Sequence, residues 1–227
     1  MRLILFDIDG TLIDSGGAGV RSLDLAFKKV FSVENGFHGI SMAGKTDSQI
    51  IKEGLAKHGL SMDGNIVAVI EAYLFHLKQE IKNDRKHTKP GVHKILQLLH
   101  HVRDIGVGLL TGNLEQGARI KLDAFNLNKY FPSGAFGSDD EDRNKLLPVA
   151  VRRFEELLNE KIAIEESIVI GDTPRDVECA HSYGAICIGV ATGPYSFNEL
   201  VEARADYVVK DLSNPATLFE SLNLSIL

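Results

Sequence analysis

The sequence contains no tryptophan, two cysteines and six prolines among 227 residues. The two cysteines, Cys179 and Cys187, are too few for a disulfide framework in a chain of this length, so we expect reduced, buried thiols and a cytoplasmic protein. No apolar run is long enough to cross a bilayer, and no signal-peptide pattern precedes the first apolar segment. We therefore expect no membrane partner.

An excess of positive charge is also lacking. The formal net charge is −6, and Lys and Arg form no dense tract, so we expect no nucleic-acid partner. The eight histidines lack metal-site spacings such as His-Glu-x-x-His. A hydrophobic content of 44% suits one domain, or a core with one insertion. The sequence leaves open whether the protein is a monomer or a homodimer.

Helices and short apolar strands alternate from Pro90 onward, after an isolated first strand at Leu3–Phe6. This alternation, with strands that lack polar positions, predicts an α/β fold, in which a Rossmann-like parallel sheet is covered by helices on both faces. The expected helices are 91–104, 115–126, 147–160 and 174–183, and the expected strands are 107–110, 167–170, 185–190 and 206–209, with a short apolar stretch near 135–136.

The segment between these parts has a different pattern. Apolar residues at three- and four-residue spacing predict helices over 20–31, 46–57 and 65–82, and no strand is evident between Ser15 and Thr88. We therefore expect an inserted, all-helical domain over residues 15–87, called the helical module below. The α/β core would comprise residues 1–14 and 88–227.

Two carboxylates follow the first strand directly, at Asp7 and Asp9. Side chains two residues apart in an extended chain share a face, so these groups project together, about 7 Å apart. Adjacent carboxylates repel each other and need a cation or a shared proton. The alternative is a solvated, Asp-rich turn at the end of a strand.

Polar residues also follow two later strands. Thr111, Gly112 and Asn113 combine a hydroxyl with backbone N–H groups at a helix start, which suits an anion, although such residues are also common helix caps. Asp172 follows strand 167–170, and Asp176 lies one helical turn later. Acidic residues that stabilise the helix dipole are the alternative interpretation, and they explain Asp176 more easily than Asp172.

The first motif, Asp7-Ile8-Asp9-Gly10-Thr11-Leu12, resembles the signature of the haloacid dehalogenase-like superfamily. The later elements follow in the family's order, and the resemblance covers essentially the whole chain. It implies a phosphatase with Mg²⁺ as cofactor, similar to the phosphoglycolate phosphatase branch, acting on a small phosphorylated metabolite. The helical module would be a cap over the active site.

The resemblance also implies roles for individual residues. Asp7 would be the nucleophile and Asp9 the general acid and base. Asp7, the backbone carbonyl of Asp9 and Asp172 would hold the metal, with Asp176 supporting it. Thr111 and Gly112, followed by Asn113, would bind the phosphoryl group.

The cation that this family places beside the nucleophile is ambiguous here. The usual Lys-Pro-x-Pro pattern is absent, and the chain reads Asp142-Arg143-Asn144-Lys145 instead. Arg143 resembles a variant found in the phosphoglycolate phosphatase-like branch, whereas Lys145 has the usual spacing to Pro148. We favour Arg143 and keep Lys145 as the alternative.

A second motif points to another class of protein. Gly39–Thr46 fits the nucleotide-binding pattern G-x-x-x-x-G-K-[ST], which functions as a P-loop only between a buried strand and a helix. No such strand precedes it, so we expect a loop of the helical module from which Lys45 contacts substrate.

Four alternative functions remain open for the protein: a P-loop nucleotide-binding protein, a non-catalytic binding module, a phosphomutase and a phosphonatase.

Overall fold

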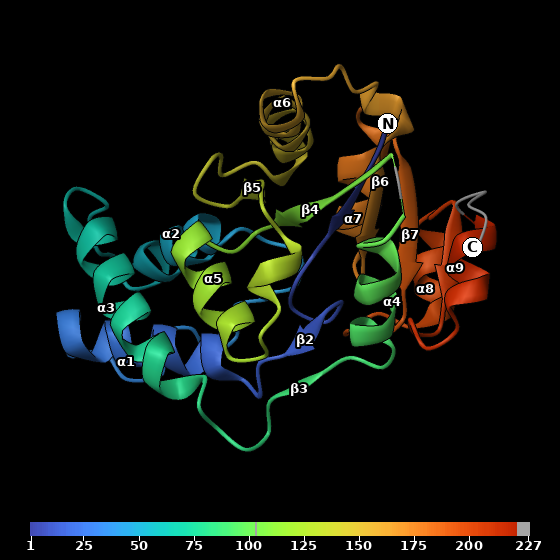
Figure 1. Ribbon diagram of the computed structural model, residues 1–227. Helices are drawn as coiled ribbons and strands as arrows, with labels where there is room; N and C mark the ends of the chain where they lie inside the picture. The colour runs from blue at the N-terminus through green and yellow to red at the C-terminus, as the bar shows by residue number, and fades with distance from the viewer. Residues whose placement is uncertain (103, 222–227) are drawn as a thin grey trace.

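The computed structural model describes residues 1–102 and 104–221. A six-stranded sheet in the order β5-β4-β1-β6-β7-β8 forms its centre (Figure 1). All of its strand pairs are parallel, as predicted. The strands are β1 (Arg2–Phe6), β4 (Ile105–Thr111), β5 (Gly134–Phe136), β6 (Ile168–Gly171), β7 (Ile186–Val190) and β8 (Tyr207–Val209).

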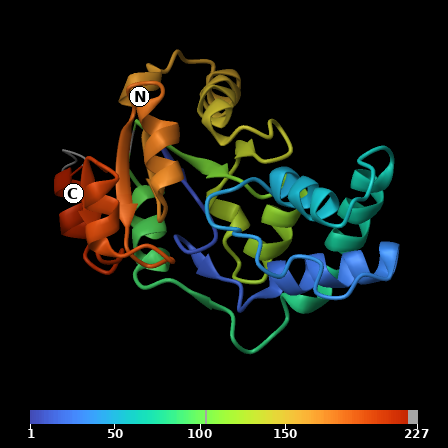
Figure 2. The ribbon, with the colours of Figure 1, turned by 180° about the vertical axis from the view of Figure 1, so that it is seen from behind.

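Helices cover both faces of this sheet because its strands are apolar on both sides. In β1, Ile4 and Phe6 enter one hydrophobic cluster, whereas Leu3 and Leu5 enter the other. Figures 1 and 2 show the two layers from opposite sides. The first cluster includes residues of α4 (Val92–Leu99), α5 (Glu115–Asp123) and α9 (Pro215–Ser221), and the second those of α6 (Leu146–Leu158) and α7 (Pro174–His181). Helix α8 (Phe197–Glu202) packs beside β7 and β8.

The helical module contains α1 (Ala18–Phe31), α2 (Asp47–Lys57) and α3 (Asn65–Glu80), inserted between β1 and β4. These helices surround a separate hydrophobic cluster that includes Phe27, Phe37 and Tyr73. The rings of Phe27 and Phe37 meet edge to face, with their centroids 4.4 Å apart. Ile120 and Phe125, on and just after α5, pack against the same cluster, which joins the module to the core.

The module is connected to the core through a small antiparallel pairing. Strand β2 (Ile13–Asp14) pairs with β3 (His87–Thr88), and the Lys89 N–H extends the pairing by donating to the Leu12 carbonyl at 3.0 Å. The prediction of no strand between Ser15 and Thr88 is therefore wrong at its last residues. Strands of two residues have too little periodicity to be recognised. The predicted domain limits fall within this pairing and stay a prediction.

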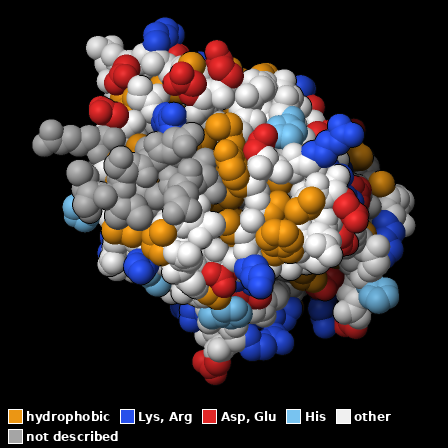
Figure 3. Space-filling view, turned by 90° about the vertical axis from the view of Figure 1, so that its right-hand side faces the viewer, with side chains coloured by type: hydrophobic (Ala, Val, Ile, Leu, Met, Phe, Trp, Pro, Cys, Tyr) orange, Lys and Arg blue, Asp and Glu red, His pale blue; other side chains and the backbone are white. Residues whose placement is uncertain are grey.

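The surface gives two further observations. In the described part of the chain, none of the helices is both long and apolar enough to cross a membrane. The face near α8 and α9 carries charges of both signs interspersed with hydrophobic side chains (Figure 3). Such mixing is ordinary for a globular protein, since apolar atoms make up much of any protein surface.

Candidate active site

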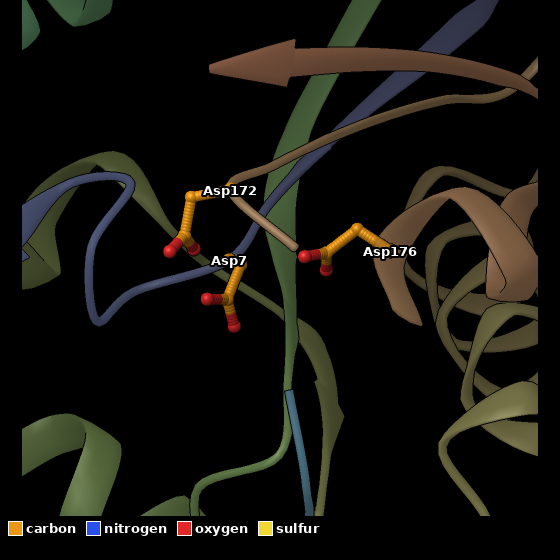
Figure 4. A group of neighbouring side chains, drawn as sticks. All are labelled: Asp7, Asp172 and Asp176. Carbon is orange, nitrogen blue, oxygen red and sulfur yellow. The ribbon is translucent and has the colours of Figure 1, made fainter. Parts of the chain in front are cut away.

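Three carboxylates meet where the central strands end. Strands β1 and β6 are neighbours in a parallel sheet, so Asp7 and Asp172, which follow them, lie at the same edge. Asp176 reaches the same point from the first turn of α7 (Figure 4). One oxygen of each group lies within 4.8 Å of the other two, and all three side chains are buried. The predicted acidic cluster therefore exists in the structure.

Asp172 has an oxygen that lacks a hydrogen-bond partner. Thr11 Oγ1 donates to Asp172 Oδ1 at 3.0 Å, whereas Oδ2 is buried and has no partner among the described residues. Burial, together with the charges of Asp7 and Asp176, raises the pKa of Asp172 well above its ordinary value. A hard divalent cation is the ligand that such an uncompensated carboxylate oxygen suits.

Two glycines make room for this carboxylate. A Cβ atom would lie 2.3 Å from Asp172 Oδ2 at Gly10 and 1.6 Å from it at Gly193. Gly10 also has φ +88°, a conformation that costs other residues steric strain. The backbone after β1 therefore comes close to Asp172 because glycine occupies this turn.

Arg143 lies between two of the carboxylates. Its Nη2 donates to Asp7 Oδ1 at 3.1 Å and to Asp176 Oδ1, and the side chain is 5% exposed. Burial raises the pKa of Asp7 to about 6, while Arg143 acts in the opposite direction. Arg143 Nε is buried without a partner among the described residues. Arg143 therefore keeps one donor that the described residues leave unpaired.

Asp176 has no free oxygen. The backbone N–H and the hydroxyl of Thr173 donate to its Oδ2 at 3.0 and 2.8 Å, in a capping box at the start of α7. Arg143 Nη2 donates to the other oxygen, Asp176 Oδ1. These contacts suit a residue that holds Arg143 in place better than a direct metal ligand.

Lys145, the alternative cation, lies elsewhere. Its side chain is 61% exposed and its ammonium group lies 3.5 Å from Asp140. It does not line the cavity that contains Asp7 and Arg143. The structure therefore brings Arg143 to the acidic cluster and leaves Lys145 at the surface.

Asp9 is held by Lys121 of α5 and by Asn113, which lies just after β4. Lys121 Nζ lies 2.6 Å from Asp9 Oδ2 and 2.6 Å from Asn113 Oδ1. The Asn113 amide donates to Asp9 Oδ2 and to Thr111 Oγ1, both at 2.9 Å. These four side chains form one network, in which Lys121 and Asn113 both donate to the same oxygen of Asp9.

The sequence interpretation missed Lys121. Its side chain is 5% exposed, and it lies on α5 between Ala118 and Leu122, which are fully buried. A lysine on the apolar face of an amphipathic helix is unusual, because burying an ammonium group requires a partner. A lysine at a core-facing position of the predicted helix 115–126 is therefore the sequence feature that indicates a buried partner for Lys121.

The helical module contacts the loop after β4 directly. The Asp47 N–H donates to the Gly112 carbonyl at 2.7 Å, and the Leu114 N–H donates to Asp47 Oδ2 at 2.9 Å. A Cβ atom at Gly112 would lie 2.2 Å from the Lys45 carbonyl oxygen. Thr46 Oγ1 adds a hydrogen bond to the Glu141 carbonyl at 3.0 Å. The start of α2 is therefore docked on the predicted phosphate-binding loop.

The burial of Asp47 predicts that the free energy of unfolding depends on pH. Burial raises its pKa to about 6 from 3.8, although Lys121 and the Leu114 N–H oppose the shift. The folded state thus holds this proton more tightly than the unfolded chain, and the Asp47 contribution to the free energy of unfolding falls as the pH rises from about 4 to about 6. Asp47→Asn removes this dependence. We expect the variant to gain about 2 kcal/mol relative to wild type between pH ~4.5 and pH ~7.

Urea unfolding of both proteins at the two pH values measures this difference. Effects of the substitution on packing and hydrogen bonding are common to both pH values, so only the titration changes the difference. A stability difference that does not vary with pH would contradict the prediction.

A cavity of about 500 Å³ lies between the core and the helical module. Asp7, Asp172 and Arg143 line it from the core, and Lys45 lines it from the module. Lys45 Nζ also lies 2.5 Å from Glu53 Oε2. Turns rather than a strand precede Gly39–Thr46, so the P-loop interpretation is wrong.

The sequence model of a family described as "Haloacid dehalogenase-like hydrolase" matches residues 4–190, a span that contains all three carboxylates and Arg143. The chain belongs to this family. As a haloacid dehalogenase-like hydrolase it is an enzyme, and the prediction of a phosphatase from this superfamily, in the phosphoglycolate phosphatase-like branch, is confirmed.

Individual proteins with similar sequences or structures include phosphatases and a phosphomutase. A phosphoglycolate phosphatase of Pseudomonas fluorescens (strain Pf0-1) is 27% identical over 225 residues, covering 93% of this chain and 77% of the relative. CbbY from Rhodobacter sphaeroides, solved in complex with phosphate, has a TM-score of 0.77 at 17% identity and covers 98% of this chain and 99% of its own. A β-phosphoglucomutase structure from Clostridium difficile has a TM-score of 0.73 at 18% identity, covering 97% of this chain and 96% of its own. The two structures share the fold.

Proposed function

We propose that this protein is a magnesium-dependent phosphatase that hydrolyses a small phosphorylated metabolite through an aspartyl-phosphate on Asp7. The observation that carries this proposal is the unpartnered oxygen of Asp172 beside Asp7 and Arg143, which line the same cavity. This arrangement would combine a nucleophile, a place for a divalent cation and a cationic side chain within one buried cluster. Charge neutralisation and positioning are what phosphoryl transfer requires of a protein.

Asp7 and Asp172 would hold the ion together with the backbone carbonyl of Asp9, since carboxylate and carbonyl oxygens suit Mg²⁺. When bound, the ion offsets the negative charge that the acidic residues and the phosphoryl group bring together. Asp176 would act by fixing Arg143, because its own oxygens are occupied.

In the first step, a carboxylate oxygen of Asp7 attacks phosphorus and the bond to the leaving oxygen breaks. Asp9 gives its proton to that oxygen. In the second step, a water molecule attacks the aspartyl-phosphate, Asp9 takes its proton, and the bond between phosphorus and Asp7 breaks. Lys121 and Asn113 would keep the Asp9 carboxyl in one orientation during both steps.

The phosphoryl oxygens would be bound by the loop after β4 and by Arg143. Gly112 and Asn113 line the cavity, and Thr111, the last residue of β4, directly precedes them. Arg143 also lines the cavity, and its charge would offset that of the phosphoryl oxygens. The helical module, docked on Gly112, would exclude water, and the stem of Lys45 would contact the organic part of the substrate.

Removing the metal tests the proposal. We expect phosphate release from a panel of phosphate monoesters to stop with EDTA and to return with MgCl₂. Asp172→Asn should remove this response to Mg²⁺. Thermal unfolding provides a readout besides activity, because a ligand at about 100 times its Kd stabilises the folded state by about 2.7 kcal/mol. Release that is insensitive to EDTA, or an equal Mg²⁺ response in Asp172→Asn, would overturn the metal site.

A further inference from the structure

The helical module contributes an apolar wall to the cavity. Val20 and Leu23 from α1, Met42 from the following loop and Ile50 from α2 line it. Val20 lines this cavity and is 43% exposed. The cavity volume of about 500 Å³ lies within the range of roughly 300 to 1,000 Å³ that holds small-molecule ligands of moderate size. An ester with only two carbon atoms would leave much of this wall uncovered.

The positive charges that line the cavity are already neutralised. Lys45 lies 2.5 Å from Glu53, and Lys89 lies 3.4 Å from Asp14. Lys121 pairs with Asp9 at 2.6 Å, and Arg143 is held by Asp7 and Asp176. These are the Lys and Arg side chains that line the cavity in the described part of the chain. A second anionic group on a substrate would therefore compete with an existing ion pair for its cation.

From this wall and these pairings we propose that the substrate is a phosphate monoester whose organic part is uncharged and largely apolar. This inference rests on the proposed function and narrows its substrate. The phosphoryl group lies against Arg143 and the loop after β4, while the organic part covers Val20, Leu23 and Met42. A carboxylated ester such as phosphoglycolate is a poor ligand, because burying its carboxylate without a free cation is costly.

Equilibrium binding to the Asp7→Asn protein tests the substrate class without turnover. With MgCl₂ present, calorimetry compares ethyl phosphate, n-hexyl phosphate and the hexyl ester that carries a carboxylate at the far end of its chain. We expect affinity to rise about tenfold or more from ethyl to hexyl. The terminal carboxylate should lower it again by a similar factor.

A charge placed on the wall tests the position of the organic part. Val20→Arg adds an unpaired cation at the apolar wall, and Val67→Arg is its matched control. Val67 is also a valine on a helix of the module, is 62% exposed and does not line the cavity. We expect Val20→Arg to shift the ratio of the hexyl and carboxylated hexyl affinities by about tenfold toward the carboxylated ester. Val67→Arg should leave the ratio unchanged.

The outcomes separate this inference from the proposed function. Equal or tighter binding of the carboxylated ester to the unmodified wall, or an equal shift in Val67→Arg, overturns the substrate class alone. Failure of every ester to bind overturns the proposed function with it. Preference for hexyl phosphate, reversed by Val20→Arg, supports both.

Discussion

Asp7→Asn is expected to lower kcat for phosphate release at least about a thousandfold, because an amide cannot replace a carboxylate as the nucleophile. Asparagine has nearly the same volume as aspartate, so the surrounding strands and the Arg143 contact need not move. Phosphate release at saturating substrate with MgCl₂ measures the loss. Asp123→Asn, the same substitution at an exposed position on α5, is expected to stay within about twofold of wild type.

Stability distinguishes this effect from misfolding. Burial raises the pKa of Asp7 to about 6, so the ionised carboxylate, which predominates at pH 7, costs more free energy in the folded protein than in the unfolded chain when no cation is bound. Removing that charge should leave the thermal midpoint without Mg²⁺ equal to or higher than that of wild type. Retention of a tenth or more of the activity in folded Asp7→Asn would contradict a nucleophilic role.

Arg143→Met is expected to lower kcat/KM about a hundredfold or more, because it removes the cation that lies between Asp7 and Asp176. Lys145→Met serves as the matched control. It removes a cation from the same short segment but from a side chain at the surface, and we expect a change within about twofold. Phosphate release over a range of substrate concentrations measures both variants.

Arg143→Met leaves two buried carboxylates without their partner, so it can also destabilise the protein. Arg143→Lys keeps the charge but has a different donor geometry. We expect it to recover part of the activity and most of the stability, as measured by urea unfolding. A loss in Lys145→Met as large as that in Arg143→Met would refute the assignment.

The geometry of one short segment explains why the sequence left these two cations unresolved. Arg143–Lys145 is a single turn of 3₁₀ helix, capped by Asp142, whose side chain accepts the Asn144 N–H at 3.0 Å. In such a turn, a residue two positions on points about 240° around the axis. One side chain therefore faces inward and the other outward. The sequence spacing to Pro148 does not specify which of the two side chains faces inward.

The carboxylates were predictable from sequence because each depends on a local feature. Asp7 and Asp172 directly follow apolar strands, and parallel strands end at the same edge of a sheet. Lys121 and Asp47 could not be assigned in the same way. Asp47 is buried where the helical module docks on the loop after β4, and Lys121 is buried against Asp9 and Asn113 of the core. Local periodicity places Lys121 on a buried helix face, but it does not identify the distant residues that either side chain contacts.

The β2–β3 pairing has a consequence for how such proteins diversify. The chain leaves the core at Asp14 and returns at His87, and these two residues are paired across one antiparallel ladder. The ends of the inserted segment are thus as close as the ends of a hairpin turn. The connection to the central sheet therefore has the same geometry whatever segment is inserted there. A lineage can lengthen, shorten or exchange that segment without rebuilding the strands that carry the carboxylates. Substrate preference and bond-breaking chemistry are therefore free to evolve at different rates within one chain.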